Sequence, residues 1–331
     1  MKQVLDVLII GAGPAGSFLS HKLARAGLQV TLLEKSTKLK RKVCGEYLCP
    51  LGVDLLEREG LQDQIIGTFL PVKGMLIVTA QQTEVVTEFP YREMFHGVAV
   101  NRELFDARLV NLAVESGATV KFGEEVKKIS KSGEHWVVET NTTKYTTRVL
   151  VGADGRKSIV SKALDNDVAV SERRVALHAY VNMPGLNIRQ GEMHIFENGA
   201  YIGINPTGER EMNFSLVLDA GELQALGSPL NALNHYISQS AHLKARFKPF
   251  EDAKVITAAY PIQHRTKSII PAHNVALIGD AAGFVDPLTG EGMYNALLSS
   301  QLLAEQIEKS FSQSLHIEKK VFVEYERQYS K

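Results

Sequence analysis

The segment GAGPAG, residues 11–16, constrains the fold of this chain more than any other feature. It follows an apolar run, VLDVLII at residues 4–10, and it precedes a stretch with helical periodicity. Gly11, Gly13 and Gly16 have the G-x-G-x-x-G spacing of dinucleotide-binding turns. In such turns, glycines permit a tight bend, close approach of a pyrophosphate to the backbone, and close helix packing. The segment therefore predicts a Rossmann-type βαβ unit that binds a dinucleotide.

A second predicted strand, QVTLLE, ends at Glu34. An acidic residue at this position binds the ribose hydroxyls in dinucleotide-binding folds. We therefore assign Glu34 to the ribose and include its neighbour Lys35 in the predicted cofactor site. The alternative is that residues 11–16 form only a tight glycine turn. Since we find one such βαβ unit, we expect NAD(P)H to dock transiently, or another protein to deliver electrons.

The composition argues against several classes of function. The 37 Lys and Arg residues balance 37 Asp and Glu residues, and no dense basic block could follow a nucleic-acid backbone. No run approaches the roughly 18 apolar residues of a membrane-spanning helix. Two cysteines fit a reducing compartment, and no Cys/His spacing indicates a zinc site. We expect a cytoplasmic protein without a metal, with peripheral contact to a membrane left open.

Two later segments indicate which dinucleotide is bound. Residues 149–160, VLVGADGRKSIV, form an apolar strand that ends in Gly-x-Asp-Gly. Residues 274–300 contain an apolar strand, a Gly-Asp turn, a glycine-containing loop and a helix. Together with the glycine turn, these ordered motifs resemble those of the p-hydroxybenzoate-hydroxylase-like FAD superfamily, including its geranylgeranyl-reductase-like branch. The resemblance covers most of the chain and implies that the cofactor is FAD.

The resemblance also implies roles for individual residues. Asp280 would bind the ribityl or ribose hydroxyls, and the helix start at 290–295 would present N–H groups to the flavin pyrimidine edge. Asp154 corresponds to a turn near the pyrophosphate that in hydroxylases also serves the pyridine nucleotide, and Arg102 to an arginine beside the phosphates. The predicted cofactor site comprises Gly11, Gly13, Gly16, Glu34, Lys35, Arg41, Cys44, Gly45, Arg102, Asp154, Gly155, Asp280, Gly290, Gly292, Met293 and Asn295.

Taken without the resemblance, some of these residues have simpler explanations. Asp280 could cap a turn, Arg102 could form a surface ion pair, and Asp154 could form an Asx-turn.

The segment RKVCGEYLCP, residues 41–50, contains both cysteines. Its C-x-x-x-x-C spacing also occurs in the redox disulfide of glutathione-reductase-like flavoenzymes, but this chain lacks room for their second nucleotide domain and dimerisation domain. A basic residue before Cys-Gly instead resembles the geranylgeranyl reductases, which implies that Cys44 lies beside the flavin ring and is a catalytic residue. Glu46 resembles the Gly-Glu of flavin halogenases. Cys44 could also be a small buried hydrophobe, and we favour that explanation for Cys49.

The remaining sequence predicts a second sheet and a discontinuous domain organisation. Strand patterns occur at 74–89, 175–183, 192–204 and 211–219. We predict an α/β fold in which a Rossmann-type FAD domain carries an inserted, mainly antiparallel β-sheet substrate domain. The FAD domain would comprise residues 1–70, 98–165 and 266–310, the substrate domain residues 71–97 and 166–265, and an amphipathic C-terminal helix residues 311–331.

The inserted sheet is expected to form a roof over the flavin and to bind the substrate. The prenyl-reductase branch has a Tyr-x-Trp-x-Phe-Pro motif that lines a lipid tunnel, but YIGINP, residues 201–206, has Gly203 and Asn205 in place of the aromatic residues. Because each missing side chain would contribute about 2–3 kcal/mol of burial, we expect a smaller or differently shaped apolar substrate. Candidate substrate residues are His178, Tyr180, His194, Phe196, Tyr201 and Pro206, although either histidine could be structural.

Two reactions are consistent with these residues. The first is FAD-dependent reduction of a carbon–carbon double bond in a lipid-like or polyketide-type molecule by hydride transfer from reduced flavin, with Cys44 or another ordered group supplying the proton. The alternative is an FAD-dependent monooxygenase that attacks an aromatic or polyketide substrate through a flavin C4a-oxygen adduct. The Cys-Gly pair favours the first, whereas Gly45-Glu46 and the altered tunnel motif favour the second. A flavin-binding protein without enzymatic activity is a third possibility.

Overall fold

The N-terminal βαβ unit forms as the glycine spacing predicts. Strand β1 (Val4–Ile10) leads through the glycine turn into α1 (Pro14–Arg25), and β2 (Val30–Glu34) pairs with β1 in parallel. The structure is a computed structural model that describes residues 4–89, 96–171, 173–183, 190–208, 210–251, 254–257, 262–313 and 319–329.

The first sheet brings the three flavin motifs to one edge. Its strand order is β8-β2-β1-β11-β10-β9, with β19 also beside β11. Strand β11 pairs with β1 along one side, and with both β10 and β19 along the other. The turns that follow β1, β11 and β19 therefore lie together. The added strands are β8 (Thr119–Phe122), β9 (Val126–Ser132), β10 (His135–Thr140), β11 (Lys144–Gly152) and β19 (Val275–Leu277).

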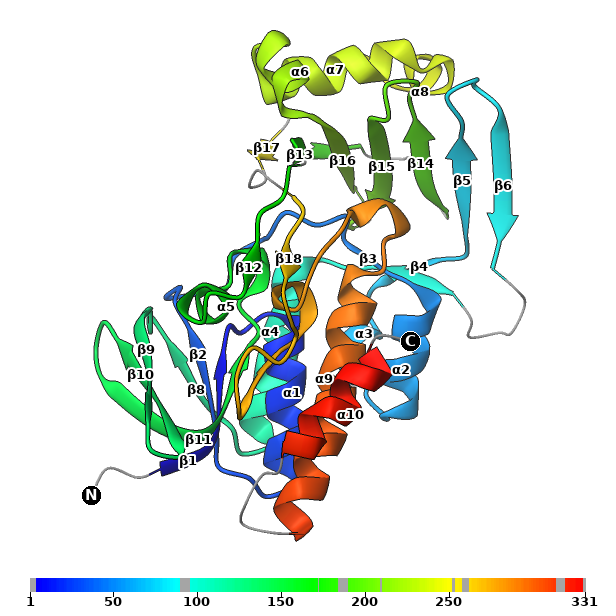
Figure 1. Ribbon diagram of the computed structural model, residues 1–331. Coiled ribbons are helices and arrows are strands. Elements are labelled where there is room, and N and C mark those ends of the chain that lie inside the picture. The colour runs from blue at the N-terminus through cyan, green and yellow to red at the C-terminus, as the bar shows by residue number, and fades with distance from the viewer. Residues whose placement is uncertain are drawn as a thin grey trace.

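Helices cover this first sheet. Helix α1 packs against both α4 (Arg102–Glu115) and α9 (Gly292–Gln313), as Figure 1 shows. Ser300 Oγ donates to the carbonyl oxygen of Ala15 at 2.8 Å, so α9 and α1 approach closely.

The segment predicted as a C-terminal helix, 311–331, overlaps the end of one described helix and all of another, and its residues 314–318 and 330–331 lie outside the described residues. Helix α9 continues to Gln313 because its apolar positions continue through Ile307 and Phe311 into the core. A separate helix, α10 (Lys319–Tyr329), packs against α9. The hydroxyl of Tyr325 on α10 donates to the carbonyl oxygen of Leu277 at 2.8 Å. Helix α10 therefore contributes Phe322 and Tyr325 to the core beside the first sheet.

The second sheet, which we call the roof sheet, has the order β17-β13-β16-β15-β14-β5-β6. Its neighbouring strands are antiparallel except for the parallel pair β14 and β5, so the predicted mainly antiparallel sheet is confirmed. The segments 74–89 and 192–204, predicted as strands with turns, form the antiparallel pairs β5-β6 and β14-β15. The strands are β5 (Gly74–Val78), β6 (Glu84–Glu88), β13 (Arg174–Asn182), β14 (Gly191–Ile195), β15 (Tyr201–Pro206), β16 (Glu211–Asp219) and β17 (Lys254–Thr257).

The two faces of the roof sheet have different neighbours. Helices α6 (Ala220–Ala225), α7 (Pro229–Gln239) and α8 (Ala241–Arg246) cover the outer face, at the top of Figure 1. The inner face packs against Val43 through a smaller apolar cluster that includes Tyr201 and Val217. The inner face is therefore the one that can meet a bound cofactor. The domain boundaries themselves stay a prediction.

Shorter elements complete the described structure. They are β3 (Tyr47–Leu48), α2 (Pro50–Arg58), α3 (Gln62–Ile66), β4 (Leu70–Val72), β7 (Gly97–Ala99), η1 (Gly155–Lys157), α5 (Ile159–Ala163), β12 (Asp167–Val168), β18 (Arg265–Thr266), η2 (Gly279–Ala281) and η3 (Pro287–Thr289). Within the described part of the chain, no helix has both the length and the apolar character needed to cross a membrane.

Candidate cofactor and substrate site

The glycine turn is shaped by close backbone contacts. Gly11 has a φ of +105°, and a Cβ there would lie 2.5 Å from the carbonyl oxygen of Ala153. A Cβ on Gly16 would lie 2.0 Å from the carbonyl oxygen of Gly11. A Cβ on Gly13 would meet only the Lys42 ammonium, at 3.7 Å. The turn is thus open at Gly13 and has a cation beside it, which fits a pyrophosphate.

Glu34 lies at the end of β2 and contacts the same turn. Its Oε2 accepts a hydrogen bond from the backbone N–H of Ala12 at 3.1 Å, and its Oε1 accepts one from Ser36 at 3.0 Å. Burial acts to raise the pKa of Glu34, but these hydrogen bonds and the charge of Lys42 lower it below its ordinary value. Glu34 is therefore an ionised acceptor at the mouth of the turn. Lys35 is exposed, and its contact with FAD stays a prediction.

The Asp154-Gly155 turn lies against Gly11, as a Cβ on Gly11 would be 2.8 Å from Asp154 Cα. Asp154 Oδ2 accepts from the N–H of Ile159, the first residue of α5, at 2.6 Å, so it does not form the Asx-turn considered as its simpler explanation, which would reach only two residues along the chain. Its Oδ1 is buried and has no hydrogen-bond partner among the described residues. Burial raises the pKa of Asp154. An unpartnered buried oxygen at this place fits a donor supplied by a bound cofactor.

Arg102 is nearly buried at the start of α4. It forms two hydrogen bonds with Asp106, at 2.9 and 3.0 Å, and Lys42 Nζ lies 3.7 Å from the same carboxylate. Burial acts to lower the pKa of Arg102, but Asp106 raises it well above its ordinary value. The ion pair is therefore internal rather than a surface pair. A contact of Arg102 with the FAD phosphates stays a prediction.

Asp280 follows β19 in η2 and is surrounded by cationic groups. Burial raises the pKa of its carboxyl group, while the charges of Arg156 and Arg102 oppose that shift. Asp280, Lys42 and Arg102 therefore enclose one polar region beside the glycine turn. A cofactor with both phosphates and hydroxyls fits such a region.

The start of α9 is placed beside this region. Gly290, with a φ of +70°, ends η3, and α9 begins at Gly292. Met293 is buried in a core cluster, and the N–H of Asn295 donates to the carbonyl oxygen of Glu291 at 2.9 Å. The predicted contact of this helix start with the flavin stays a prediction.

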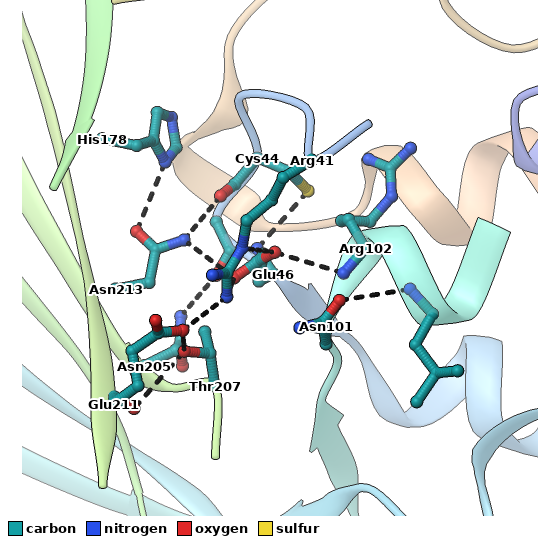
Figure 2. A network of polar contacts seen from close by, with 12 residues as sticks. Arg41, Cys44, Glu46, Asn101, Arg102, His178, Asn205, Thr207, Glu211 and Asn213 are labelled. Atoms are coloured by element: carbon teal, nitrogen blue, oxygen red, sulfur yellow. Dashed lines mark hydrogen bonds and ion pairs between the residues drawn. The ribbon is translucent and has the colours of Figure 1, made fainter. Parts of the chain in front are cut away.

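Residues 41–46, which we call the Cys44 loop, are bound to the roof sheet by side-chain amides (Figure 2). Asn213 Nδ2 donates to the carbonyl oxygen of Cys44 at 2.8 Å, and Asn205 Nδ2 donates to that of Gly45 at 3.1 Å. The two asparagines are partners in the register of β15 and β16. A Cβ on Gly45 would meet nothing within 4 Å. The loop is therefore fixed at its carbonyls and open at Gly45.

A buried ion pair holds the other end of the Cys44 loop. Glu46 is fully buried with a φ of +53°, and it accepts two hydrogen bonds from Arg41, at 3.1 and 3.0 Å. Burial raises the pKa of Glu46, and Arg41 opposes this shift. Arg41 also bonds Glu211 at 2.6 Å and lies 3.7 Å above the ring centre of Tyr180. Arg41 thus connects the loop to the roof sheet, and its predicted contact with FAD stays a prediction.

The two cysteines have different surroundings, and both are free thiols. Cys44 is partly buried, its Sγ accepts from the N–H of Glu46 at 3.4 Å, and it packs against the cluster that contains Met293. Cys49 is buried at the start of α2, and burial raises the pKa of its thiol. Cys44 therefore packs against the core cluster to which the start of α9 also contributes.

Three of the predicted substrate residues lie on the inner face of the roof sheet. His178 Nδ1 lies 2.8 Å from Ser215 Oγ, and burial lowers its pKa to about 4. Tyr180 lies under Arg41, and Tyr201 Oη donates to Asp286 at 2.6 Å.

The other three predicted substrate residues are not brought to the Cys44 loop. His194 lies beside His242 of α8, with ring centres 5.4 Å apart, and Phe196 packs against Tyr236 of α7 at 4.7 Å. Pro206 pairs with Met212, which belongs to the apolar cluster between the outer face of the roof sheet and its covering helices. Successive residues of a strand face opposite sides, and 194 and 206 share the outer side. The sequence interpretation had placed all six on one roof without separating its faces.

Several residues of this network, including Asn205, Asn213, Glu46 and Glu211, were not among the predicted site residues. Asn205 had been considered only as a replacement for an aromatic residue, and Glu46 only for its resemblance to halogenases. Glu211 had no assigned role. The signal for Asn205 is its strand register with Asn213, which local sequence patterns do not contain.

Comparison with known proteins identifies the family. Residues 4–311 match the model of the FAD binding domain family. The chain belongs to that family. The predicted FAD-dependent oxidoreductase family is thereby confirmed.

The chain is similar to proteins from distant organisms. It is 26% identical over 313 residues to digeranylgeranylglycerophospholipid reductase 2 of Methanopyrus kandleri, which covers 91% of this chain and 76% of that protein. It is 27% identical over 336 residues to conditioned medium factor receptor 1 of Dictyostelium discoideum, covering 94% of this chain. The chain spans 65% of the length of the Dictyostelium protein.

Solved structures show the same fold. A flavoprotein/dehydrogenase from Cytophaga hutchinsonii has a TM-score of 0.85 at 20% identity, covering 98% of this chain and 83% of that one. The myxobacterial chondrochloren halogenase, an FAD-dependent halogenase, has a TM-score of 0.85 at 24% identity, covering 99% and 79%.

Proposed function

We propose that this protein is an FAD-dependent reductase that saturates a carbon–carbon double bond in a lipid-like or polyketide-type small molecule. The observation that carries the proposal is the position of Cys44, which packs against the cluster that contains Met293 of α9 and whose carbonyl oxygen is bound by Asn213 of the roof sheet. Similarity to archaeal digeranylgeranylglycerophospholipid reductases supports the choice of substrate class. The protein would act in the cytoplasm, which its two free thiols support, and could contact a membrane surface to reach a lipid.

The residues of the polar region have separate tasks in this proposal. The N–H groups of the glycine turn, together with Lys42 and Arg102, would bind the cofactor phosphates. Glu34 and Asp280 would accept hydrogen bonds from its hydroxyls, and Asp154 Oδ1 would gain the partner it lacks. When bound and reduced, FAD supplies a hydride.

Cys44 is proposed to deliver the proton that completes the reduction. Its thiol lies on a loop whose two carbonyls are fixed by Asn205 and Asn213, so its position relative to the roof is set by the sheet. A positioned acid of this kind typically contributes about 10²–10⁴ in rate. The electron donor is proposed to be NAD(P)H or another small carrier that docks transiently, or an electron-transfer protein.

An anaerobic assay tests the proposal. FAD-loaded protein is reduced with dithionite without oxygen and incubated, in separate reactions, with a glycerolipid carrying geranylgeranyl chains and with a lipid carrying shorter unsaturated prenyl chains, and each lipid is analysed by mass spectrometry. We expect the product to gain the mass of two hydrogen atoms. A Gly11→Ala variant serves as the control, because its added Cβ collides with Ala153 and should prevent FAD binding. An unchanged lipid without oxygen, together with an oxygenated product in air, would overturn the reductase proposal.

The alternative function, an FAD-dependent monooxygenase, is favoured by one observation. Asn205 binds the Cys44 loop instead of lining an apolar tunnel, so positions 203 and 205 do not supply the two aromatic groups with which the prenyl reductases would grip a long chain. The anaerobic assay separates the two functions, because only the reductase forms product without oxygen.

A further inference from the structure

The carboxylate of Asp286 joins the segment before α9 to two strands of the roof sheet. Residues 284–290, which we call the η3 loop, lie between η2 and α9. Asp286 Oδ1 accepts hydrogen bonds from the backbone N–H of Leu288 at 2.9 Å and from Tyr201 Oη at 2.6 Å. Its Oδ2 accepts one from Arg174 Nη1 at 2.9 Å. Since Arg174 begins β13 and Tyr201 begins β15, one carboxylate holds the η3 loop against two roof strands.

Arg174 and Tyr201 are themselves fixed in the roof sheet. Arg174 Nη2 donates to the carbonyl oxygen of Gly199 at 2.9 Å, and the guanidinium lies 5.2 Å from the ring centre of Tyr201. Tyr201 is 4% exposed and packs in the apolar cluster of the inner face with Val217. A substrate residue was predicted at this position, but the hydroxyl of Tyr201 already has Asp286 as a partner. The bond to the η3 loop therefore explains this tyrosine better than a contact with the substrate does.

The η3 loop is also held at both of its ends. Phe284 and His264 exchange two backbone hydrogen bonds, each at 2.8 Å. Gly290 ends η3 with a φ of +70°, and a Cβ there would lie 3.0 Å from the ring of Tyr47. Asp286 supplies the contact between these two ends. The position of the first turn of α9, which follows the loop, therefore depends on Asp286.

We propose that Asp286 is a positioning residue for the flavin, which holds the start of α9 against the roof sheet and thereby raises the redox potential of bound FAD. Reduction adds negative charge to the flavin pyrimidine edge, and N–H groups at a helix start stabilise negative charge. A displaced helix start would favour oxidised FAD. Because Arg174 balances the charge of Asp286, the effect acts through position. The inference rests on the part of the proposed function in which the start of α9 contacts the flavin.

Redox titration of the FAD-loaded protein tests the inference without a substrate. The midpoint potential is measured against a reference dye during slow anaerobic reduction, and FAD content and the thermal unfolding midpoint are measured alongside. The test variants are Asp286→Ala and Tyr201→Phe, which each remove the bond between the η3 loop and β15. The matched control is Tyr236→Phe, which removes a buried tyrosine hydroxyl on the outer face of the same sheet, where Asn198 donates to it at 2.7 Å.

We expect each test variant to lose at least about tenfold of its preference for reduced over oxidised FAD, which lowers the midpoint potential by about 30 mV for a two-electron couple. The control variant should keep this preference within about twofold of wild type while it loses comparable thermal stability. The inference is overturned if either test variant keeps the wild-type potential, or if Tyr236→Phe shifts the potential as much. Because the titration involves no turnover, an unchanged lipid in the anaerobic assay would leave these outcomes unaffected.

Discussion

Asn205 and Asn213 lie opposite each other on two strands of the roof sheet, and their amides bind two consecutive carbonyls, those of Gly45 and Cys44. One strand pair thus holds the peptide that carries the candidate acid. Two side-chain hydrogen bonds therefore join the Cys44 loop to the roof sheet. Replacing either asparagine should change the position of Cys44.

Replacing Asn213 should destabilise the protein measurably. In Asn213→Ala, the carbonyl of Cys44 loses its partner in a partly buried place, which should lower the free energy of unfolding by about 1–2 kcal/mol. Urea denaturation followed by circular dichroism measures this. Asn231→Ala is the control, because Asn231 also binds a carbonyl, that of Leu226, but at an exposed position. If Asn213→Ala lowers the free energy of unfolding no more than Asn231→Ala does, the hydrogen bond from Asn213 to Cys44 contributes no more to stability than an exposed one.

Replacing Glu34 should weaken FAD binding. Glu34→Ala removes the carboxylate that binds the N–H of Ala12 and the proposed ribose hydroxyls, so we expect roughly ten- to a hundredfold lower affinity. Quenching of flavin fluorescence on titration with the apoprotein measures the dissociation constant. Glu139→Ala, at an exposed position on β10, should bind FAD as wild type does. Wild-type affinity in Glu34→Ala would contradict our placement of the ribose.

The two cysteines should respond unequally to substitution. Cys44→Ser keeps the size of the side chain but offers a much weaker acid, so we expect lipid reduction to slow at least about tenfold. Cys49→Ser should keep wild-type turnover, since Cys49 is buried at the start of α2. Single-turnover kinetics with both variants, at equal FAD content, provide the comparison. Normal turnover of Cys44→Ser would show that Cys44 is not the proton donor and serves only to pack against the core.

The contribution of Glu192, on the outer face of the roof sheet, to the stability of the fold should be lost at acidic pH. Burial acts to raise the pKa of Glu192, but His194 and Arg246 lower it from 4.5 to about 2. Because the folded-state pKa is lowered, Glu192 stabilises the fold above about pH 4.5, and this contribution disappears as the pH falls toward 2. The lowering corresponds to roughly 3 kcal/mol at neutral pH.

Glu192→Gln tests this acid lability through its free energy of unfolding across the pH range. Its difference from wild type should be largest near neutral pH and should shrink steadily below about pH 4.5. Glu57→Gln, at an exposed position on α2, should stay within about 0.5 kcal/mol of wild type throughout. A difference for Glu192→Gln that does not change with pH would contradict the coupling.

The sequence predicted the parts of this structure that depend on local patterns. The glycine turn, its flanking strand and helix, and the acidic end of β2 are contiguous, so spacing alone located them. The antiparallel character of the roof followed from strand alternation. The assignment of side chains to the two faces of that sheet did not follow, because alternation within a strand does not show which side packs against α6, α7 and α8.

Contacts between segments that are far apart in the chain could not be predicted from local sequence patterns. Asn205 binds a carbonyl 160 positions earlier in the chain, and Glu211 binds Arg41 across 170 positions. These pairs exist only because β15 and β16 adopt one register and the Cys44 loop folds back beneath them.

The most direct test of the central claim is anaerobic reoxidation of the flavin, followed by its absorbance in a stopped-flow instrument. FAD-loaded protein is reduced without oxygen and mixed with a glycerolipid that carries unsaturated prenyl chains. The account predicts that the absorbance of oxidised flavin returns in proportion to the lipid added. A flavin that stays reduced with the lipid and is reoxidised only when oxygen is admitted would contradict it.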